Sequence, residues 1–510
     1  MKANSVQFVT GLMTCALSVT ALGQQPVPAG AVATPVSTSS FAGLVNDHFR
    51  QQNSAFTNWD FGGSVRGRFE VKDGYGIPGV PGSLDFRDHG ADVDNDYLLE
   101  KIRLRAGYTD PWWSALVEGE SSLAQSDQRW AYANNPPVAG TVGKKGDGPE
   151  ADSIELHQAI VGVGNLKELP LALKVGRMEM SYGDERLIGA FGWNNIGRTF
   201  DAANVRWQND WFGVDLFASR PVIPQNGVFD VPNHYDFFSG CYATSLKIPK
   251  NIFDVYFLAR NASAQAAAAM PSPQFPQPSA RDLYTAGLRL KSQPGEFGPW
   301  DYALEGAYQF GSFLDPRAGA PTQRLDQSSY MMVIQGGYTF TETWARPRLG
   351  LEYSHGSGDS NPQDNRHETF ENLFPTNHKF YGYMDFVSLE NIHDIRASLS
   401  LKPTSKLNVT IEGHGFWLAD THDSFYNVAG VARGGAGPTP GTGYGVNPGY
   451  SSFVGTELDV VATYTVARFA QVEVGFGHFF AGDYIQQSLS NPNFGSQDAS
   501  FVYAQVNLNF

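Results

Sequence analysis

The C-terminal segment alternates strictly between two faces and ends in an aromatic residue. On one face of an extended strand would lie Val502, Ala504, Val506, Leu508 and Phe510. On the other would lie Tyr503, Gln505, Asn507 and Asn509. Because successive side chains of a strand point to opposite sides, this period of two suits a wall between lipid and water. The pattern predicts the closing strand of a membrane β-barrel, with an edge strand of a soluble sandwich as the alternative.

The N-terminus has the features of an export signal. Met1-Lys2 gives a basic start, Val6 to Leu22 is mostly apolar, and Ala21-Leu22-Gly23 offers small residues for cleavage. The apolar stretch is too short and too poorly flanked to span a membrane as a helix. We therefore expect residues 1–23 to be a signal peptide and the mature chain to start at Gln24; a buried N-terminal helix is the alternative.

Charge and cysteine content exclude two classes of protein. The chain has 51 Asp+Glu against 36 Lys+Arg and a net charge of −15, which argues against a nucleic-acid partner because such partners require a basic face. Of its 2 cysteines, Cys15 leaves with the signal peptide, so neither an internal disulfide nor a cysteine metal site is expected.

Segments of alternating polarity recur along the chain, and their connections alternate between short and long. Short connections such as Asp110-Pro111 and Asn209-Asp210 alternate with long ones such as 127–151 and 357–390. Short turns on one rim and long loops on the other are typical of outer-membrane barrels, whose turns are periplasmic and whose loops are extracellular. The prediction is an all-β fold: a single transmembrane antiparallel barrel of about 18 strands over residues 59–510. The segments are 60–72, 95–109, 112–126, 152–165, 170–181, 199–208, 211–220, 236–249, 252–262, 281–291, 299–312, 327–341, 345–356, 391–402, 405–418, 452–466, 469–482 and 498–510.

Tryptophan positions agree with this topology. Indole prefers the membrane–water interface because its ring is apolar and its N–H requires a polar partner. Seven of the ten tryptophans fall at segment ends assigned to the short-turn rim: Trp59, Trp112, Trp113, Trp207, Trp211, Trp300 and Trp344.

The stretch 24–58 precedes the first strand. Its first part, up to Ser40, is rich in Pro, Ala, Ser and Thr, which is typical of a flexible lead. Residues 41–52 permit a short helix with Phe41, Leu44 and Phe49 on one side. A flexible, solvated periplasmic extension is the favoured interpretation, and a helix under the barrel or in its mouth is the alternative.

Charged residues alternate on the inward faces of several strands. Arg66 and Arg68 do so on the first strand, and Lys101, Arg103 and Arg105 on the second. A charge on the lipid face near midplane costs about 2–4 kcal/mol, so these residues must line water. They either pair with neighbouring acids and brace the wall, or form unpaired ladders that guide an anionic solute.

One long connection combines opposite charges with glycine. Residues 182–201 hold several acids and arginines together with Gly183, Gly189, Gly192 and Gly197. Such a loop is predicted to fold into the pore and form a constriction, with a cap over one rim as the alternative. The predicted solute path comprises Arg103, Arg105, Arg177, Asp184, Glu185, Arg186, Arg198, Asp201 and Arg348.

Catalytic and metal-binding motifs are not found in the sequence. It contains no G-x-S-x-G elbow, no H-E-x-x-H helix and no phosphate-binding loop. We expect no enzyme activity, cofactor or metal; a Ser-His-carboxylate set at the outer rim would instead favour a barrel hydrolase. Calcium binding in the loop 356–386 is left open by its oxygen-bearing residues, Asp359, Asn361, Asp364 and Asp385.

Four runs of residues resemble the alginate export family of outer-membrane proteins. They are Gly176-Arg177, 182–187 (YGDERL), 195–201 (NIGRTFD) and 374–385 (FPTNHKFYGYMD). The resemblance implies an eighteen-stranded, monomeric barrel that passes a polyanionic polysaccharide outward along charged lumen residues. The alginate exporter is associated with a long periplasmic turn near its C-terminus, whereas this chain has only Val466-Ala467-Arg468-Phe469 there.

The expected function is therefore that of an outer-membrane porin or exporter for a hydrophilic, anionic poly- or oligosaccharide. A selective uptake porin for small hydrophilic solutes is the alternative. The expected partners are membrane lipid, lipopolysaccharide and the outer-membrane assembly machinery, which would read the strand that ends at Phe510.

Overall fold

The computed structural model describes residues 43–76, 82, 84–90, 92–127, 129, 149–268, 279–315, 323–434, 443–490 and 494–510. The expected signal peptide, 1–23, lies outside the described residues.

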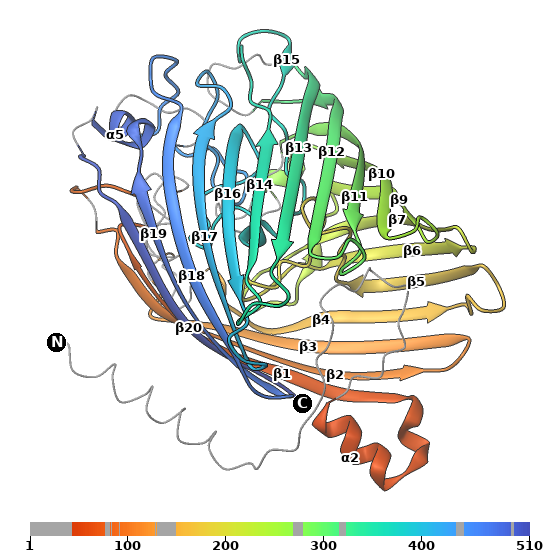
Figure 1. Ribbon diagram of the computed structural model, residues 1–510. Helices are drawn as coiled ribbons and strands as arrows, with labels where there is room; N and C mark the ends of the chain where they lie inside the picture. Colours follow the sequence, from red (N-terminus) through yellow and green to blue (C-terminus); the bar gives the residue numbers. More distant parts are fainter. Residues whose placement is uncertain are drawn as a thin grey trace.

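Eighteen antiparallel strands form one closed wall (Figure 1). Closure occurs where β1 pairs with both β2 and β20. Two further strands of two residues each, β8 (Val231–Pro232) and β15 (Arg366–His367), belong to loops and pair with β7 and β13. The wall strands are β1 (Trp59–Asp73), β2 (Asn95–Thr109), β3 (Trp113–Gln125), β4 (Asp152–Val163), β5 (Leu171–Met178), β6 (Phe200–Gln208), β7 (Phe212–Ile223), β9 (Asp236–Ser245), β10 (Asn251–Ala262), β11 (Arg281–Ser292), β12 (Trp300–Phe313), β13 (Leu325–Thr339), β14 (Arg348–Gly356), β16 (Ile392–Leu401), β17 (Leu407–Leu418), β18 (Phe453–Ala467), β19 (Ala470–Ala481) and β20 (Ala499–Asn509).

The strand order and the asymmetry of the connections confirm the prediction from sequence. Most boundaries agree within a few residues, and the larger shifts have local causes. The strand expected at 345–356 begins at Arg348, because Ala345 and Arg346 adopt positive φ angles of 61° and 42° in the preceding turn. The strand expected at 170–181 ends at Met178, where the chain turns into the lumen.

Alternation within each strand separates lipid-facing from lumen-facing side chains. On β2, Ile102 and Leu104 are exposed on the outside, whereas Lys101, which directly precedes Ile102, is buried on the inside. Arg103 and Arg105 share the inward face with Lys101. The period of two thus places charge in the lumen and hydrocarbon against the membrane, as the sequence predicts.

The helices lie at the two ends of the barrel. The structure contains α2 (Leu44–Gln52), α4 (Gln265–Ala268) and α5 (Asp483–Ser490), together with the 3-10 turns η1 (Ser54–Asn58) and η2 (Asn377–Lys379). The helix α2 lies at the same end as the C-terminus, and α5 at the opposite end (Figure 1). Among the described residues, no helix is both long and apolar enough to cross a membrane.

The described part of the N-terminal extension is helical and contacts the periplasmic rim. Asn46 of α2 is buried, donates to a carboxylate oxygen of Asp60 at 2.5 Å and accepts from the backbone N–H of Phe61 at 2.7 Å. Asp47 forms an ion pair with Arg468 at 2.7 Å. Of the two interpretations of residues 41–52, the helix is the one seen over 44–52.

All seven tryptophans singled out above lie on the rim that carries α2 and the C-terminus. Each lies within a short turn or next to a strand end on that rim, and each is exposed. Their exposed fractions range from 38% for Trp59 to 77% for Trp344, which suits a belt at the membrane interface.

We expect Trp112, Trp207, Trp211 and Trp344 to occupy a single interfacial band. Quenchers attached at known depths of a lipid chain should quench all four with the same depth profile, because the strand register places them at one end of the wall. Single-tryptophan variants give the four profiles separately. Tryptophans found in both leaflets would contradict the assigned topology.

Candidate functional site

The connection between β5 and β6, residues 179–199, folds into the barrel; we call it the inward loop. Lumen-facing cations of β1 and β2 bind its backbone carbonyls. Arg66 donates to Gly192 at 2.9 Å, and Lys101 donates to Asn194 at 3.0 Å. Arg68 donates to the carbonyl of Trp193 at 2.7 Å. These contacts hold the middle of the loop against the wall.

Asn195 anchors the inward loop further. Its side chain is fully buried, and its amide nitrogen donates to the carbonyls of Glu100, Leu123 and Glu150 at 3.1, 3.1 and 3.2 Å. Its own backbone N–H donates to the Glu150 carboxylate at 2.6 Å. An asparagine with its donors fully used in this way fixes one loop position relative to two strands.

The start of the inward loop reaches different strands. Asp184 forms ion pairs with Arg289 and Lys291 of β11, at 2.9 and 2.7 Å. Arg186 pairs with Glu352 of β14 at 2.6 Å, and both side chains are buried. Burial opposes ionisation of Asp184, but the charges of Arg289 and Lys291 outweigh it and hold its pKa below the usual range. The loop therefore bridges the lumen between β1–β2 and β11–β14.

A second connection, residues 357–391 between β14 and β16, also lies inside the barrel; we call it the second inward loop. It contacts the inward loop through the backbone, because Gly189 N–H donates to Phe374 at 2.8 Å and Thr376 N–H donates to Glu185 at 2.9 Å. Arg198 donates to the carbonyl of Pro375 at 2.8 Å. The two loops thus form one layer across the lumen.

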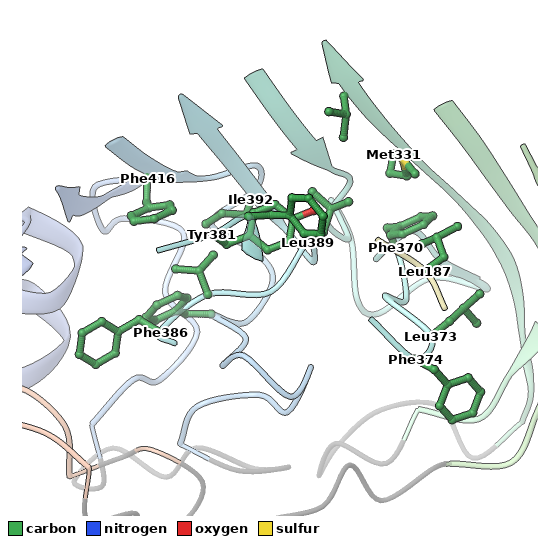
Figure 2. Close-up of a cluster of buried hydrophobic side chains, with 14 of the residues drawn as sticks. Leu187, Met331, Phe370, Leu373, Phe374, Tyr381, Phe386, Leu389, Ile392 and Phe416 are labelled. Carbon is green, nitrogen blue, oxygen red and sulfur yellow. The ribbon is translucent and has the colours of Figure 1, made fainter. Parts of the chain in front are cut away.

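An apolar cluster joins the two loops to the wall (Figure 2). Leu187 of the inward loop belongs to the same buried cluster as Phe370 and Phe374 of the second inward loop. Met331 of β13 and Phe416 of β17 supply the wall side of this cluster. Side chains buried in this way pack as in the interior of a soluble domain, so the layer has a fixed shape.

The residues predicted for the solute path are ion-paired or hydrogen-bonded. Arg103 binds Glu120 and Glu179, and Arg177 binds Glu155 and Asp201 at 2.6 and 2.8 Å. Arg105 lies 3.9 Å from Glu118, Arg348 2.5 Å from Asp301, and Lys379 3.3 Å from Glu185. Of the two interpretations of the lumen charges, pairing with neighbouring acids describes these positions, and an unpaired ladder does not.

Three lumen cations differ from that pattern. Arg66, Lys101 and Arg198 donate only to carbonyl or amide oxygens of the two inward loops, and none of them forms an ion pair with a described carboxylate. Arg198 alone of these belongs to the predicted path. Positive charge that no directly contacting described carboxylate balances therefore lies within the layer of inward loops and on the wall next to it.

On the extracellular side of this layer lies a cavity of about 370 Å³, which we call the vestibule. It is lined by the ends of wall strands, by both inward loops and by the loop that follows β17. Its charged residues are Glu70, Lys72, Asp85, Arg129, Glu150, Glu155, His157, Arg198, Asp230, Asp236, Arg260, Asp385, Glu390 and Arg433.

The sequence analysis did not predict that the second inward loop enters the pore. One feature of the sequence could have indicated it: a long connection is rich in large apolar residues without a period of two, including Phe370, Phe380 and Phe386. The four residues considered for calcium do not come together either: among described residues, the only group of three such ligands within 4.8 Å is Asp152, Glu155 and Asp230.

A Ser–His pair does occur at the extracellular rim, near Asp498. His478 Nδ1 lies 3.0 Å from Ser500 Oγ, and its Nε2 lies 3.9 Å from the Asp498 carboxylate. That second distance is too long for the hydrogen bond that orients a catalytic base. Both side chains also share the lipid-facing side of their strands with Phe480 and Val502. The pair therefore gives no support to hydrolysis in the lumen.

Comparison with known proteins decides the family. The family model for alginate export matches residues 59–492. The chain belongs to the alginate export family. A search of curated proteins found no match.

Solved porins share the fold of this alginate export family barrel at low sequence identity. OccAB4 of Acinetobacter baumannii has a TM-score of 0.53 and 11% identity, covering 89% of this chain and 98% of that one. OccAB1 of the same organism also has a TM-score of 0.53, with 10% identity, covering 89% of this chain and 97% of that one. OpdK of Pseudomonas aeruginosa, solved with vanillate, has a TM-score of 0.51 and 10% identity, covering 88% of this chain and 98% of that one. The protein is an outer-membrane barrel of the porin and exporter type.

Glu390 makes the vestibule sensitive to pH. It is buried, and burial raises its pKa to about 7 although Asn372 N–H donates to it at 2.9 Å. A carboxyl whose pKa is raised in the folded state binds more protons there than when unfolded, so stability falls as pH rises from about 4.5 to 7. Glu390→Gln should therefore be more stable than wild type at pH 8, by about 3 kcal/mol, and equal at pH 4.

Thermal unfolding of the detergent-solubilised barrel at several pH values measures this difference. Glu368→Gln, in the same loop but bonded to exposed Ser360, is the matched control and should follow the wild-type pH dependence. An unchanged pH dependence in Glu390→Gln would show that this carboxyl is not the group responsible.

Proposed function

We propose that this barrel passes an anionic oligo- or polysaccharide across the outer membrane, through the vestibule and past the layer of inward loops. Membership of the alginate export family supports a polyanionic solute. The observation that carries the proposal is a set of three cations that contact no described carboxylate: Arg198 of the inward loop, and Arg66 and Lys101 of the wall, which donate to that loop.

The acids that line the vestibule outnumber its arginines and lysines, but ion pairing and protonation limit their repulsion of an anion. Most acids of the vestibule form an ion pair. Asp85 pairs with Arg433 at 2.5 Å, and Asp236 pairs with Arg260 at 2.7 Å. Glu390 forms no ion pair with a described cation, and burial raises its pKa to about 7. Protonation of this carboxyl near neutral pH reduces repulsion of an anion. Charge inside a low-dielectric wall acts on a solute with little screening by salt.

Uptake of a small organic anion is the second candidate function. A cavity of about 370 Å³ is the size of a small-molecule site rather than an open polymer channel. The solved barrels that share the fold include one crystallised with vanillate. Export of a polymer would require movement of the inward loops, whereas passage of a small solute would require a smaller movement of the same loops.

Several finer features belong to the same proposal. Residues 1–23 direct export and are removed before Gln24. The barrel assembles through its C-terminal strand, contacts lipopolysaccharide with its outer face, and acts as a monomer. The alternating β20, with exposed Val502 and Val506 outside and buried Tyr503 inside, supports the role of that strand.

Blocking of ion current in planar bilayers tests the proposal. Uronic-acid oligomers should block wild-type channels in a charge-dependent manner, whereas neutral glucans of equal length should not. Arg198→Gln should weaken this block several-fold, because it removes one uncompensated charge of the vestibule. Arg324→Gln, an arginine of the outer rim that pairs with Asp282, is the matched control and should block as wild type.

The blocking pattern also separates the two candidates. Block by small organic acids but not by oligomers would favour the uptake porin. Equal block by neutral and acidic oligomers, or unchanged block in Arg198→Gln, would contradict selection of anions by the loop layer.

A further inference from the structure

Three carboxylates meet where the loop between β7 and β9, residues 224–235, reaches the vestibule wall. Asp152 and Glu155 come from β4, and Asp230 comes from the loop. One oxygen from each carboxylate lies within 4.8 Å of the others, and all three residues are buried. Acids this close repel each other unless a proton or a cation lies between them.

The described residues supply too little positive charge for this group. Arg177 contacts Glu155 at 2.6 Å, but it also contacts Asp201 at 2.8 Å, so one guanidinium serves two carboxylates. Arg177 reaches Asp230 only at the backbone carbonyl, 3.1 Å away. No described Lys, Arg or His forms an ion pair with the carboxylate of Asp152 or Asp230.

Asp152 is the residue that points to a ligand. Its exposed fraction is 1%, and neither of its carboxylate oxygens accepts a hydrogen bond from a described N–H or O–H donor; the group that faces it is the carboxyl of Asp230. Burial of a carboxylate with both oxygens unsatisfied is among the least favourable arrangements in a folded protein. Burial, together with the charges of Asp152 and Glu155, raises the pKa of Asp230 to about 8, in line with the same shortage of positive charge.

We propose that Asp152, Glu155 and Asp230 bind a divalent cation of the calcium type. Carboxylate oxygens are the ligands that hard cations prefer, and Ca–O distances of about 2.3–2.6 Å place opposite ligand oxygens up to about 5 Å apart. The three ligand oxygens of the group lie within 4.8 Å of one another, so one cation can contact all three. Glu155 and Asp230 line the vestibule, so the ion enters from the extracellular side.

The ion joins the 224–235 loop to the wall. The loop already contacts β4 through Asp230 N–H, which donates to Glu155 at 3.1 Å, and through Asn226, which accepts from Ser153 N–H at 3.1 Å. A cation shared by β4 and the loop strengthens this connection and stabilises the folded state by mass action. This role does not depend on which solute the barrel passes.

Calorimetric titration of the refolded full-length barrel in detergent, free of lipopolysaccharide and stripped with chelator, tests the site. Wild type should bind one Ca²⁺ per chain with a dissociation constant of about 10⁻⁴–10⁻³ M, as in extracellular calcium modules, and its melting temperature should rise with Ca²⁺. Asp152→Asn and Asp230→Asn should each weaken binding by at least about 10-fold, as loss of a metal-site partner does. Asp364→Asn, which changes a partly exposed acid of the second inward loop, is the matched control and should bind as wild type.

Three results would overturn the proposal. The first is a wild-type barrel with no Ca²⁺-dependent heat or melting shift, a measurement that needs no variant to fold. The second is wild-type affinity in Asp152→Asn. The third is a pair of observations: the Asp152→Asn variant without metal melts at a higher temperature than wild type without metal, and Ca²⁺ does not change the melting temperature of wild type. In that case the carboxyls share a proton and not a cation.

Discussion

Deletion of Phe510 is expected to abolish assembly of the barrel in the outer membrane while leaving export to the periplasm intact. The Phe510 backbone exchanges two hydrogen bonds of 2.9 Å with Gly63 of β1, at the seam where β20 closes the wall. Two such bonds contribute only about 1–3 kcal/mol, which is too little to account for complete loss of a barrel of this size. A complete loss would therefore indicate recognition of the terminal aromatic residue during assembly.

Cell fractionation and the heat-dependent electrophoretic mobility of folded barrels measure the outcome. Phe480→Ala removes a more exposed, lipid-facing phenylalanine from β19 and should assemble normally. Phe510→Trp should restore assembly, because it keeps an aromatic terminus. Normal insertion of the deletion variant would count against the proposed role of the terminal strand.

Replacement of residues 182–198 by a short Gly-Ser linker should raise single-channel conductance several-fold. The inward loop crosses the lumen from Asn195 at β2–β3 to Arg186 at β14, and its removal also exposes the apolar face of the second inward loop. The remaining loop should then become mobile, so current noise should increase as well. Planar-bilayer recording in salt solution measures both changes.

A change that leaves the contacts of this loop intact is the control. An added Cβ at Gly192 would meet no atom within 4 Å, so Gly192→Ala should conduct as wild type. Circular dichroism and electrophoretic mobility should show that the shortened variant still forms its wall. If it conducts like wild type, the loop is a cap and the solute path lies elsewhere.

The wall was predictable from sequence because its signal is local. On β2, successive side chains point alternately outward and inward: Ile102 and Leu104 lie outside, and Arg103 and Arg105 lie inside. This alternation fixes both the strand and its orientation. The same reasoning placed the tryptophans on one rim. Strand ends were less certain where a turn required positive φ, as at Arg346.

The lumen was predictable only in part because its contacts are not local. Arg186 and Glu352 are 166 positions apart, and no periodicity relates them. Sequence suggested that residues 182–201 enter the pore, but not which wall residues hold them. Phe370 and Phe374 of the second inward loop follow no strand pattern, and their burial depends on a partner loop that only the fold identifies.

The apolar cluster of the inward loops has a consequence for the chain before it reaches the membrane. The protein has two apolar surfaces separated by a single layer of strands: an outer one that lipid covers, and an inner one that the chain covers itself (Figure 2). Before the ring of strands closes, neither surface has its cover, so both are exposed to water at once. Any factor that keeps the unfolded chain soluble would then have to shield the 357–391 segment as well as the strands.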